Sequence, residues 1–455
     1  MKYIAMLIFC FFGINLSAQM PNSIPDNEKI YGLSKFWQEV TYNFVYWNKV
    51  DKTEWENAYK DLITEVQKTE NDYEYYRLLQ RFCASLNDGH TNVYFPDTIR
   101  KTLYNTHFGE YRLFLTNIEG KAIVTRTNLS KKDEIPAGTE VIKVNGIDTK
   151  TYLEKEVIPF ISSSTDYIRK DRAVSNMFRA PAGTSFNVTF RLPDGTHIER
   201  KLTHKKTKEK EVYPEFEDGQ LFEFKWIDEE VAYISLNSFS DPKINSLFIE
   251  KLPELYKAEK LIIDLRKNGG GNTKTGRDIL QYLTNDTLLY GSKTQSRLHI
   301  PSFKAWGKPI TEKDTIGNKW ATQAYLNYHD KSIFYFPYEA DTIRLEAKRL
   351  VVPTAILTGH NTASAAEDFL IYTENQEHMI KIGGPTFGST GQPMTFTLPG
   401  GGSARVCTKQ DTYPNGKEFV GYGIQPDIKI EKKLDDYLND NDPVLQKAIG
   451  YLKKK

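Results

Sequence analysis

The sequence is poor in cysteine and lacks an excess of charge of either sign. Three cysteines occur in 455 residues, and 60 Lys and Arg residues nearly balance 59 Asp and Glu residues. A nucleic-acid-binding surface normally needs a clear basic excess, so this balance argues against nucleic acid as the main partner. Motifs for bound groups are also missing: there is no His-Glu-x-x-His, no cysteine pair at zinc spacing and no phosphate loop. We therefore expect neither a metal nor an organic cofactor.

Long apolar runs are missing except at the N-terminus. Lys2 precedes the apolar stretch from Ile4 to Ile14, and Leu16-Ser17-Ala18 is a plausible cleavage site. This pattern predicts an export signal over residues 1–18, because the run is too short to span a bilayer. Gln19 stands where a lipoprotein would need cysteine. The sequence thus predicts an exported protein, periplasmic or extracellular, with no stable membrane span.

The cysteines that remain after cleavage are far apart. Cys10 leaves with the signal, so Cys83 and Cys407 stay in the mature chain. They can form one disulfide or none, and two buried small side chains are the simpler interpretation.

The rest of the chain has the composition of a folded soluble protein of roughly three domains. Hydrophobic residues make up 39% and aromatic residues 13%, which excludes wholesale disorder. From about residue 27 to 86, Trp37, Val40 and Phe44 recur at helical spacing, which predicts a helical region. Short alternating segments over about 104–207, such as Lys121 to Thr127, then predict a compact β-rich domain.

An α/β pattern occupies the C-terminal half. Apolar strands are expected at residues 231–236, 261–265 and 350–357, and helices at residues 275–283 and from Ala363 to about Thr373. Alternation of this kind is typical of a parallel sheet covered by helices.

Three glycines follow the apolar strand that ends near Leu265. Glycines at Gly269, Gly270 and Gly271 would let backbone N–H groups approach a ligand closely, as an oxyanion site requires. A glycine turn after a strand is often only a turn, and this spacing fits neither a dinucleotide fingerprint nor a phosphate loop.

A serine begins the helix that follows the next apolar strand. Ser364 sits where free N–H groups and the positive end of the helix dipole can stabilise a developing negative charge. The commoner use of a serine in this position is to cap the helix.

Two histidines are candidate general bases, because imidazole exchanges protons near neutral pH. His90 lies in the segment Leu86 to Val93, which leaves the helical region and enters a strand, and His360 lies four residues before Ser364. Either histidine can instead be structural.

Taken in order, these segments resemble the C-terminal processing (tail-specific) serine peptidase family. The matching motifs are Asp264-Leu265-Arg266 with Asn268 and the glycines, Thr362-Ala363-Ser364-Ala365-Ala366-Glu367, Gly384-Pro385-Thr386-Phe387-Gly388 and Gly423-Ile424-Gln425-Pro426-Asp427. The resemblance implies an α/β peptidase core of ClpP/crotonase-like fold over residues 209–440. It also implies an N-terminal helical region over 27–103 that carries the base, and an inserted β-rich PDZ-like domain over 104–208.

The residue after Gly388 decides the branch of the family. Members with a Ser-Lys pair carry lysine there, whereas this chain has Ser389, and a hydroxyl cannot serve as the general base. The chain is instead similar to the tricorn-like branch, in which a histidine before the PDZ-like domain is the base, and His90 occupies that place. That branch has a serine just before the histidine, where this chain has Gly89. It also uses a carboxylate near the C-terminal end, for which Glu418 is the candidate by position, with Asp88 and Glu367 as alternatives.

The resemblance implies a serine endopeptidase that acts through an acyl-enzyme. Ser364 would be the nucleophile and His90 the base, with N–H groups of Gly270 or Gly271 and of Ala365 as the oxyanion hole. Substrates would be unfolded or tail-exposed polypeptides, which the PDZ-like domain could add as a strand. The alternatives are a catalytically inactive peptide-binding protein of the same fold and a serine esterase.

Overall fold

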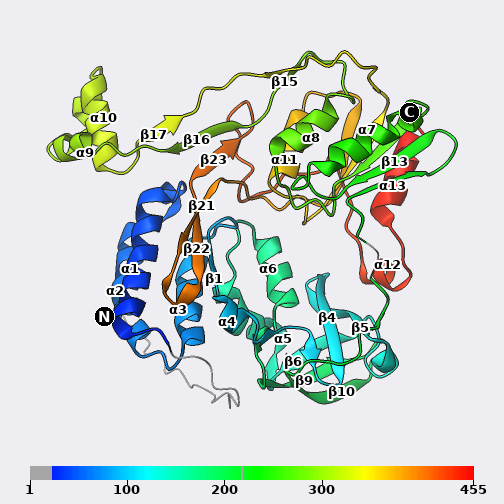
Figure 1. Cartoon of the computed structure of the whole chain (residues 1–455), viewed down its shortest axis with the longest axis horizontal. Helices are drawn as coiled ribbons and strands as arrows, with labels where there is room; N and C mark the ends of the chain where they lie inside the picture. The colour runs from blue at the N-terminus through cyan, green and yellow to red at the C-terminus, as the bar shows by residue number, and fades with distance from the viewer. Residues whose placement is uncertain (1–22, 217–218) are drawn as a thin grey trace. The chain divides into compact units, whose positions relative to one another are not determined.

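The computed structural model describes residues 23–216 and 219–455, coloured from blue to red in Figure 1. The described chain divides into two compact units. The smaller comprises Asp97–Val157 and Ala173–Phe216, and the larger comprises residues 23–96, 158–172 and 219–455. The export signal expected at residues 1–18 lies outside the described residues. Within the described ranges, none of the helices is long and apolar enough to cross a membrane.

A six-stranded sheet forms the centre of the larger unit. Its strands in spatial order are β12 (Phe222–Trp226), β13 (Val231–Leu236), β14 (Lys260–Asp264), β19 (Thr354–Thr358), β20 (Met379–Gly383) and β24 (Ile428–Lys429). Only β12 is antiparallel to its neighbour, and the other five strands run parallel. Every residue of β13 and β19 is buried, as expected for strands covered on both faces.

Helices cover both faces of this sheet. They are α7 (Lys243–Leu255), α8 (Thr273–Leu280), α11 (Ala365–Tyr372) and α13 (Pro443–Leu452). Val444, Ala448 and Leu452 of α13 join one core cluster with side chains of β13, β14, β19 and β20. On the other side α8 packs against α7 and α11. Because the strands are parallel, the loops after β14, β19 and β20 leave from the same edge of the sheet, where α/β proteins commonly bind ligands.

Three helices precede this sheet in the chain, where the sequence predicts a helical region. They are α1 (Asp26–Asn43), α2 (Lys52–Gln67) and α3 (Asp72–Ala84). Phe36 of α1 packs against Trp55 and Phe82 and against Phe396, which belongs to a distant part of the chain. The helices therefore fold onto the C-terminal half of the larger unit.

A small three-stranded sheet connects the two ends of the larger unit. Strand β1 (Asn92–Tyr94) pairs antiparallel with β22 (Ser403–Cys407), which pairs with β21 (Pro393–Thr397). Asn92 lies opposite Arg405, and the Cys407 N–H donates to Thr91 Oγ1 at 3.0 Å. This pairing holds the segment that contains His90 beside residues more than 300 positions later.

The smaller unit contains the β-rich segments predicted from the sequence. Its main sheet has the order β10 (His197–Thr203), β9 (Ser185–Arg191), β6 (Glu140–Val144), β5 (Lys121–Asn128), β4 (Tyr111–Ile118) and β3 (His107–Phe108). Val124, Val141, Val188 and Phe190 are among its fully buried side chains. Alternation of buried and exposed residues along β9 shows that this sheet has one covered face.

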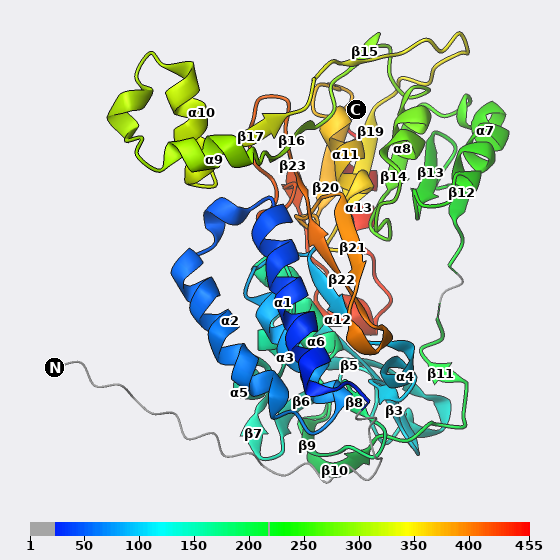
Figure 2. The same ribbon diagram turned by 60° about the vertical axis from the view of Figure 1, so that its left-hand side comes forward.

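A helical hairpin without a counterpart in the sequence predictions projects from the larger unit. Strands β16 (Lys293–Arg297) and β17 (Ile333–Tyr335) form its base, and helices α9 (Pro301–Gly307) and α10 (Lys319–Tyr328) form its end. The hairpin stands apart from the central sheet in both views (Figures 1 and 2). Trp306 and Trp320 near its end stay 51% and 48% exposed.

Both cysteines of the described chain are buried free thiols. Cys83 lies in α3 and Cys407 at the end of β22. Of the two interpretations left open by the sequence, the structure thus has separate thiols and no disulfide between them.

Candidate active site

Ser364 lies at the N-terminus of α11, at the carboxyl edge of the central sheet. Its backbone has φ 55° and ψ −120°, a conformation that residues other than glycine rarely adopt. Ser364 is half-buried, and the N–H of Ala365, the first residue of the helix, has no acceptor among the described residues. Strain of this kind collects at functional sites, and the free N–H points to anion stabilisation beside the serine.

Glu367 ties the Ser364 turn to the loop that follows β20. Its fully buried carboxylate accepts from the Ser364 N–H at 2.9 Å, the Thr386 hydroxyl at 2.5 Å and the Gly388 N–H at 2.8 Å. Burial raises the pKa of Glu367 to about 7, against the opposing effect of these three donors. The carboxylate is thus a structural link between the Ser364 turn and the loop after β20.

The glycine turn after β14 packs directly against Ser364. Gly270 has φ 96°, and a Cβ there would lie 2.7 Å from Ser364 Cβ and 2.6 Å from the Ala363 carbonyl oxygen. Only glycine fits this approach, which places the turn beside Ser364.

The two candidate glycine donors of the oxyanion hole differ in their availability. The Gly270 N–H donates to Asn268 Oδ1 at 2.9 Å, so it is already engaged. The Gly271 N–H has no acceptor in the described part of the chain. Asn268 is fully buried and also accepts the Ala363 N–H at its carbonyl oxygen, 3.0 Å away, so it fixes both loops.

His90 lies in a loop whose backbone is held by buried polar groups. The Gly89 N–H donates to Ser164 Oγ at 2.9 Å, and Ser164 donates to Asp88 at 3.2 Å. Asp88 also accepts the Thr91 hydroxyl at 2.7 Å, and its burial raises the pKa of this carboxyl. Asp88 therefore anchors the loop, because its described bonds go to Ser164, Thr91 and the backbone of His90, and not to the imidazole.

The imidazole of His90 contacts a residue from the opposite side of the site. Its Nδ1 lies 2.7 Å from Ser389 Oγ, and Nε2 has no hydrogen-bond partner among the described residues. Burial, with smaller contributions from Arg405 and Arg172, lowers the pKa of His90 to about 4. The ring is neutral at pH 7 and can accept a proton.

His90 and Ser364 share no hydrogen bond within the described chain, but a short path connects them. Glu367 accepts N–H groups from both Ser364 and Gly388, and the next residue, Ser389, contacts His90. Catalytic hydrogen bonds often tighten only when substrate binds. A chain of contacts thus runs from Ser364 through Glu367 and Gly388 to Ser389 and His90.

Glu418 forms its hydrogen bonds away from Ser364 and His90. Its carboxylate accepts from Lys49 at 3.2 Å and from Gln410 at 3.1 Å, and its side chain is 42% exposed. Neither partner is a candidate catalytic residue. The structure thus brings Ser389 to His90, and joins Glu418 to a surface ion pair.

His360, the other candidate base, forms a separate pair. Its Nδ1 lies 2.5 Å from Asp171 Oδ2, and its ring stacks on Tyr167 with 4.7 Å between ring centroids. The Tyr167 hydroxyl donates to the Thr386 carbonyl oxygen at 2.6 Å. His360 is thus held by Asp171 and Tyr167, and Tyr167 connects it to Thr386 in the loop after β20.

Sequence reasoning missed Asn268, Ser164 and Asp171 as parts of this site. Asn268 directly precedes the three glycines after β14, so the sequence motif already contained it. Ser164 and Asp171 lie in residues 158–172, which show no motif, and only the fold brings them to the His90 and His360 loops.

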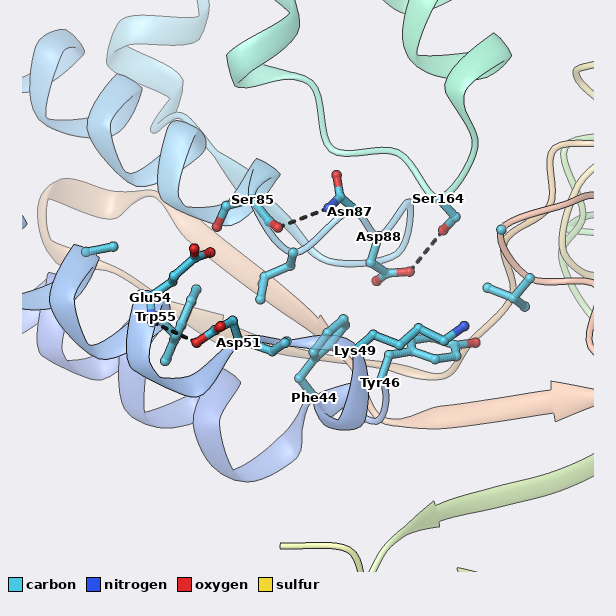
Figure 3. Close-up of a pocket in the computed structure, with 15 residues that line it drawn as sticks. Phe44, Tyr46, Lys49, Asp51, Glu54, Trp55, Ser85, Asn87, Asp88 and Ser164 are labelled. Carbon is cyan, nitrogen blue, oxygen red and sulfur yellow. Dashed lines mark hydrogen bonds between the residues drawn. The ribbon is translucent and has the colours of Figure 1, made fainter. Parts of the chain in front are cut away.

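A pocket of about 590 Å³ lies beside the His90 loop (Figure 3). Its lining includes the buried apolar side chains of Phe44, Trp55 and Leu86. Asp88 and Ser164, which hold the His90 loop, line the same pocket, and Figure 3 shows the hydrogen bond between them. Within residues 23–216 and 219–455, no three His, Cys, Asp or Glu side chains gather as metal ligands would.

Sequence comparison matches residues 230–430 to peptidase family S41. Two relatives are carboxyl-terminal-processing proteases, from Picosynechococcus sp. (strain PCC 7002) and Synechocystis sp. (strain PCC 6803). They are 22% identical over 325 and 309 residues, or 70% and 67% of this chain. The matched part spans 63% and 57% of the length of these two relatives.

Solved structures share the fold over nearly the whole chain. Mature CPAF complexed with lactacystin superposes with a TM-score of 0.66 at 15% identity, covering 94% of this chain and 97% of that one. Mature CPAF gives a TM-score of 0.65 at the same identity, with 94% and 96% coverage. The mixed α/β architecture is therefore one that known proteins adopt.

Proposed function

Since the chain is a serine-type peptidase of family S41, the family of the carboxyl-terminal-processing proteases, we propose that it is an endopeptidase with Ser364 as nucleophile and His90 as base. Its substrates are unfolded or tail-exposed polypeptides. The observation that carries the proposal is the strained Ser364 backbone beside the free N–H of Ala365. A serine that only capped the helix would need neither the strain nor the glycine packed against it.

The first half of the reaction acylates Ser364. Ser364 Oγ bonds to the carbonyl carbon of the substrate while its proton moves to His90 Nε2, and the carbonyl π electrons move to the oxygen. The carbon–nitrogen bond then breaks, and the leaving amine takes the proton from Nε2. The neutral state of His90 supports the role of base at pH 7.

N–H groups on both sides of Ser364 stabilise the oxyanion. Ala365 and Gly271 are the proposed donors, because the Gly270 N–H is engaged by Asn268. The role of Gly270 is then to let the turn approach Ser364 closely. Loss of one oxyanion donor typically slows acyl transfer by about a hundredfold or more.

Water completes the second half of the reaction. A water molecule gives a proton to His90 Nε2 as its oxygen attacks the acyl carbon, and the proton returns to Ser364 Oγ as the ester bond breaks. The products are a free carboxyl end and the regenerated serine.

The smaller unit is the proposed PDZ-like domain. Its sheet ends in β10 and β3, and an extended peptide can add to such an edge as a further strand. Export through the N-terminal signal, with cleavage after Ala18, would bring the enzyme to periplasmic or extracellular polypeptides.

A fluorophosphonate probe tests the proposal on the full-length mature protein. We expect the wild type to label and to digest an unfolded protein, with Ser364→Ala losing both activities and His90→Ala losing at least two orders of magnitude in rate. A serine far from the site, Ser332→Ala, is the matched control. Labelling that persists in Ser364→Ala would refute the assignment of the nucleophile.

The second candidate function is peptide binding without cleavage. The observation that favours it is the missing hydrogen bond between His90 and Ser364 among the described residues. A wild-type protein that binds unfolded peptide but neither labels nor cleaves would establish it. Turnover of esters with no peptide cleavage would instead indicate an esterase.

A further inference from the structure

Ser389 is the residue that contacts the His90 ring, and no role follows for it from the motifs. Its side chain is 0% exposed, and its Oγ lies 2.7 Å from His90 Nδ1. We propose that Ser389 is a positioning residue that fixes the orientation and tautomer of His90, in the place that a carboxylate takes in other serine hydrolases. This inference rests on the proposed function of His90 as the base.

The chemistry requires the proton to be on one particular nitrogen. A neutral imidazole carries one N–H, and His90 accepts from Ser364 at Nε2 only if Nδ1 holds that proton. Ser389 Oγ can accept the Nδ1–H bond and keep it throughout the cycle, because Nδ1 stays protonated when Nε2 gains and loses its proton. A hydroxyl adds no negative charge, so it orients the ring without making it strongly basic.

Gly89, the residue before His90, has no side chain that would occupy the space of the Ser389 hydroxyl. A Cβ at Gly89 would lie 2.9 Å from Ser389 Oγ, 3.1 Å from Ser389 Cβ and 2.9 Å from Phe387 Cε1. A side chain at position 89 and the Ser389 side chain therefore compete for one volume. The serine that the resemblance leads us to expect at position 89 is absent, and a hydroxyl reaches the histidine from residue 389 instead.

The loop that carries Ser389 is rigid enough to position a ring. The neighbouring Gly388 donates its N–H to Glu367, and its carbonyl oxygen accepts the Gly421 N–H at 2.9 Å. On the other side, Ser164 and Asp88 hold the backbone of the His90 loop. The imidazole is thus clamped between two loops that are each fixed by buried hydrogen bonds.

The first experiment compares Ser389→Ala with the wild type and with Ser332→Ala, using peptide hydrolysis. We expect kcat to fall about 10- to 100-fold, by analogy with the loss of the partner that orients a metal-bound histidine, with KM changed less than twofold. Ser389→Thr keeps the hydroxyl and should recover activity relative to Ser389→Ala. The double variant Gly89→Ser/Ser389→Gly should recover more activity than Gly89→Ser alone, because it moves the hydroxyl and removes the two close contacts with Ser389, so that only the contact with Phe387 remains.

The second experiment reads the tautomer directly. ¹⁵N NMR of histidine-labelled protein, assigned with His90→Ala, should show Nδ1 protonated in the wild type and a mixture of tautomers in Ser389→Ala. Unchanged kcat and unchanged ¹⁵N shifts in Ser389→Ala would overturn the inference. If the wild type neither labels nor cleaves, the proposed function fails, while the ¹⁵N shifts still decide whether Ser389 holds the ring.

Discussion

Glu367 is the residue whose protonation should matter most near neutral pH. Its carboxylate accepts three hydrogen bonds, and a proton on either oxygen would remove an acceptor from the Ser364 turn or the Gly388 loop. The carboxylate is present above its pKa of about 7 and lost below it. We therefore expect kcat/KM to rise as pH increases through about 7.

Glu367→Gln separates this effect from other titrations. Its amide must turn an NH₂ group toward one of the three donors, which costs about 1–3 kcal/mol for a buried unsatisfied group. We expect low activity that no longer varies between pH 6 and 8. If the glutamine variant keeps the wild-type pH dependence, a group other than Glu367 causes the rise of kcat/KM near pH 7.

Protonation of His90 should cause a second loss of activity on the acid side of the pH profile, at a lower pH than the loss caused by Glu367. The active form of the ring is neutral, and burial lowers its pKa to about 4, so the base is lost only as pH falls through about 4. In the Glu367→Gln background, residual activity should therefore persist to about pH 5. A limb near pH 6.5 in that background would show that the base is an ordinary solvated histidine.

At the scale of elements, the glycine turn after β14 can be tested against its own neighbour. Gly270→Ala would place a Cβ 2.6–2.7 Å from Ala363 and Ser364 at a positive φ, whereas a Cβ at Gly269 has no atom within 4 Å. We expect Gly270→Ala to lose labelling of Ser364 and Gly269→Ala to keep it. Equal labelling of the two variants would show that the turn does not support the nucleophile.

The C-terminal helix α13 provides a stability prediction. Asp442 caps this helix through the Leu445 N–H and forms a bidentate pair with Arg266, whose other partner is Asp264 at the end of β14. We expect Asp442→Ala to cost about 1–3 kcal/mol in unfolding free energy, because it loses a cap and leaves Arg266 short of a partner. The control Glu431→Ala removes an exposed pair with Lys429 and should cost less than about 0.5 kcal/mol. Denaturant unfolding measures both values.

The elements that the sequence predicts well are those defined by local patterns. The apolar run of β14 and the helix after Ser364 lie within a few residues of their predicted bounds, because burial on both faces imposes an unbroken apolar strand. Ser364 and the glycines at 269–271 belong to motifs that directly follow such apolar strands.

The contacts that complete the candidate site could not be predicted from the sequence. The bond of Ser389 to His90 and that of Asn268 to Gly270 depend on loop conformations that no local pattern encodes. The α9–α10 hairpin has mixed polarity, so its amphipathic signal was weak, and the pairing of β1 with β22 joins segments 300 residues apart. Long-range pairing is decided by the whole fold.

For the whole molecule, the larger unit is discontinuous in sequence. It comprises residues 23–96, 158–172 and 219–455, and the smaller unit is formed from the segments between them. Its parts must therefore find one another across long stretches of chain, which generally slows folding.

The pairing of β1 with β22 sets the moment at which the proposed active site can form. During synthesis the His90 loop is made early, but its supporting strand and Ser389 emerge only after some three hundred further residues. A ribosome-bound chain that ends before Ser389 would carry Ser364 without the residue that contacts His90. The order of synthesis thus delays assembly of the proposed site until both segments of the larger unit have been made.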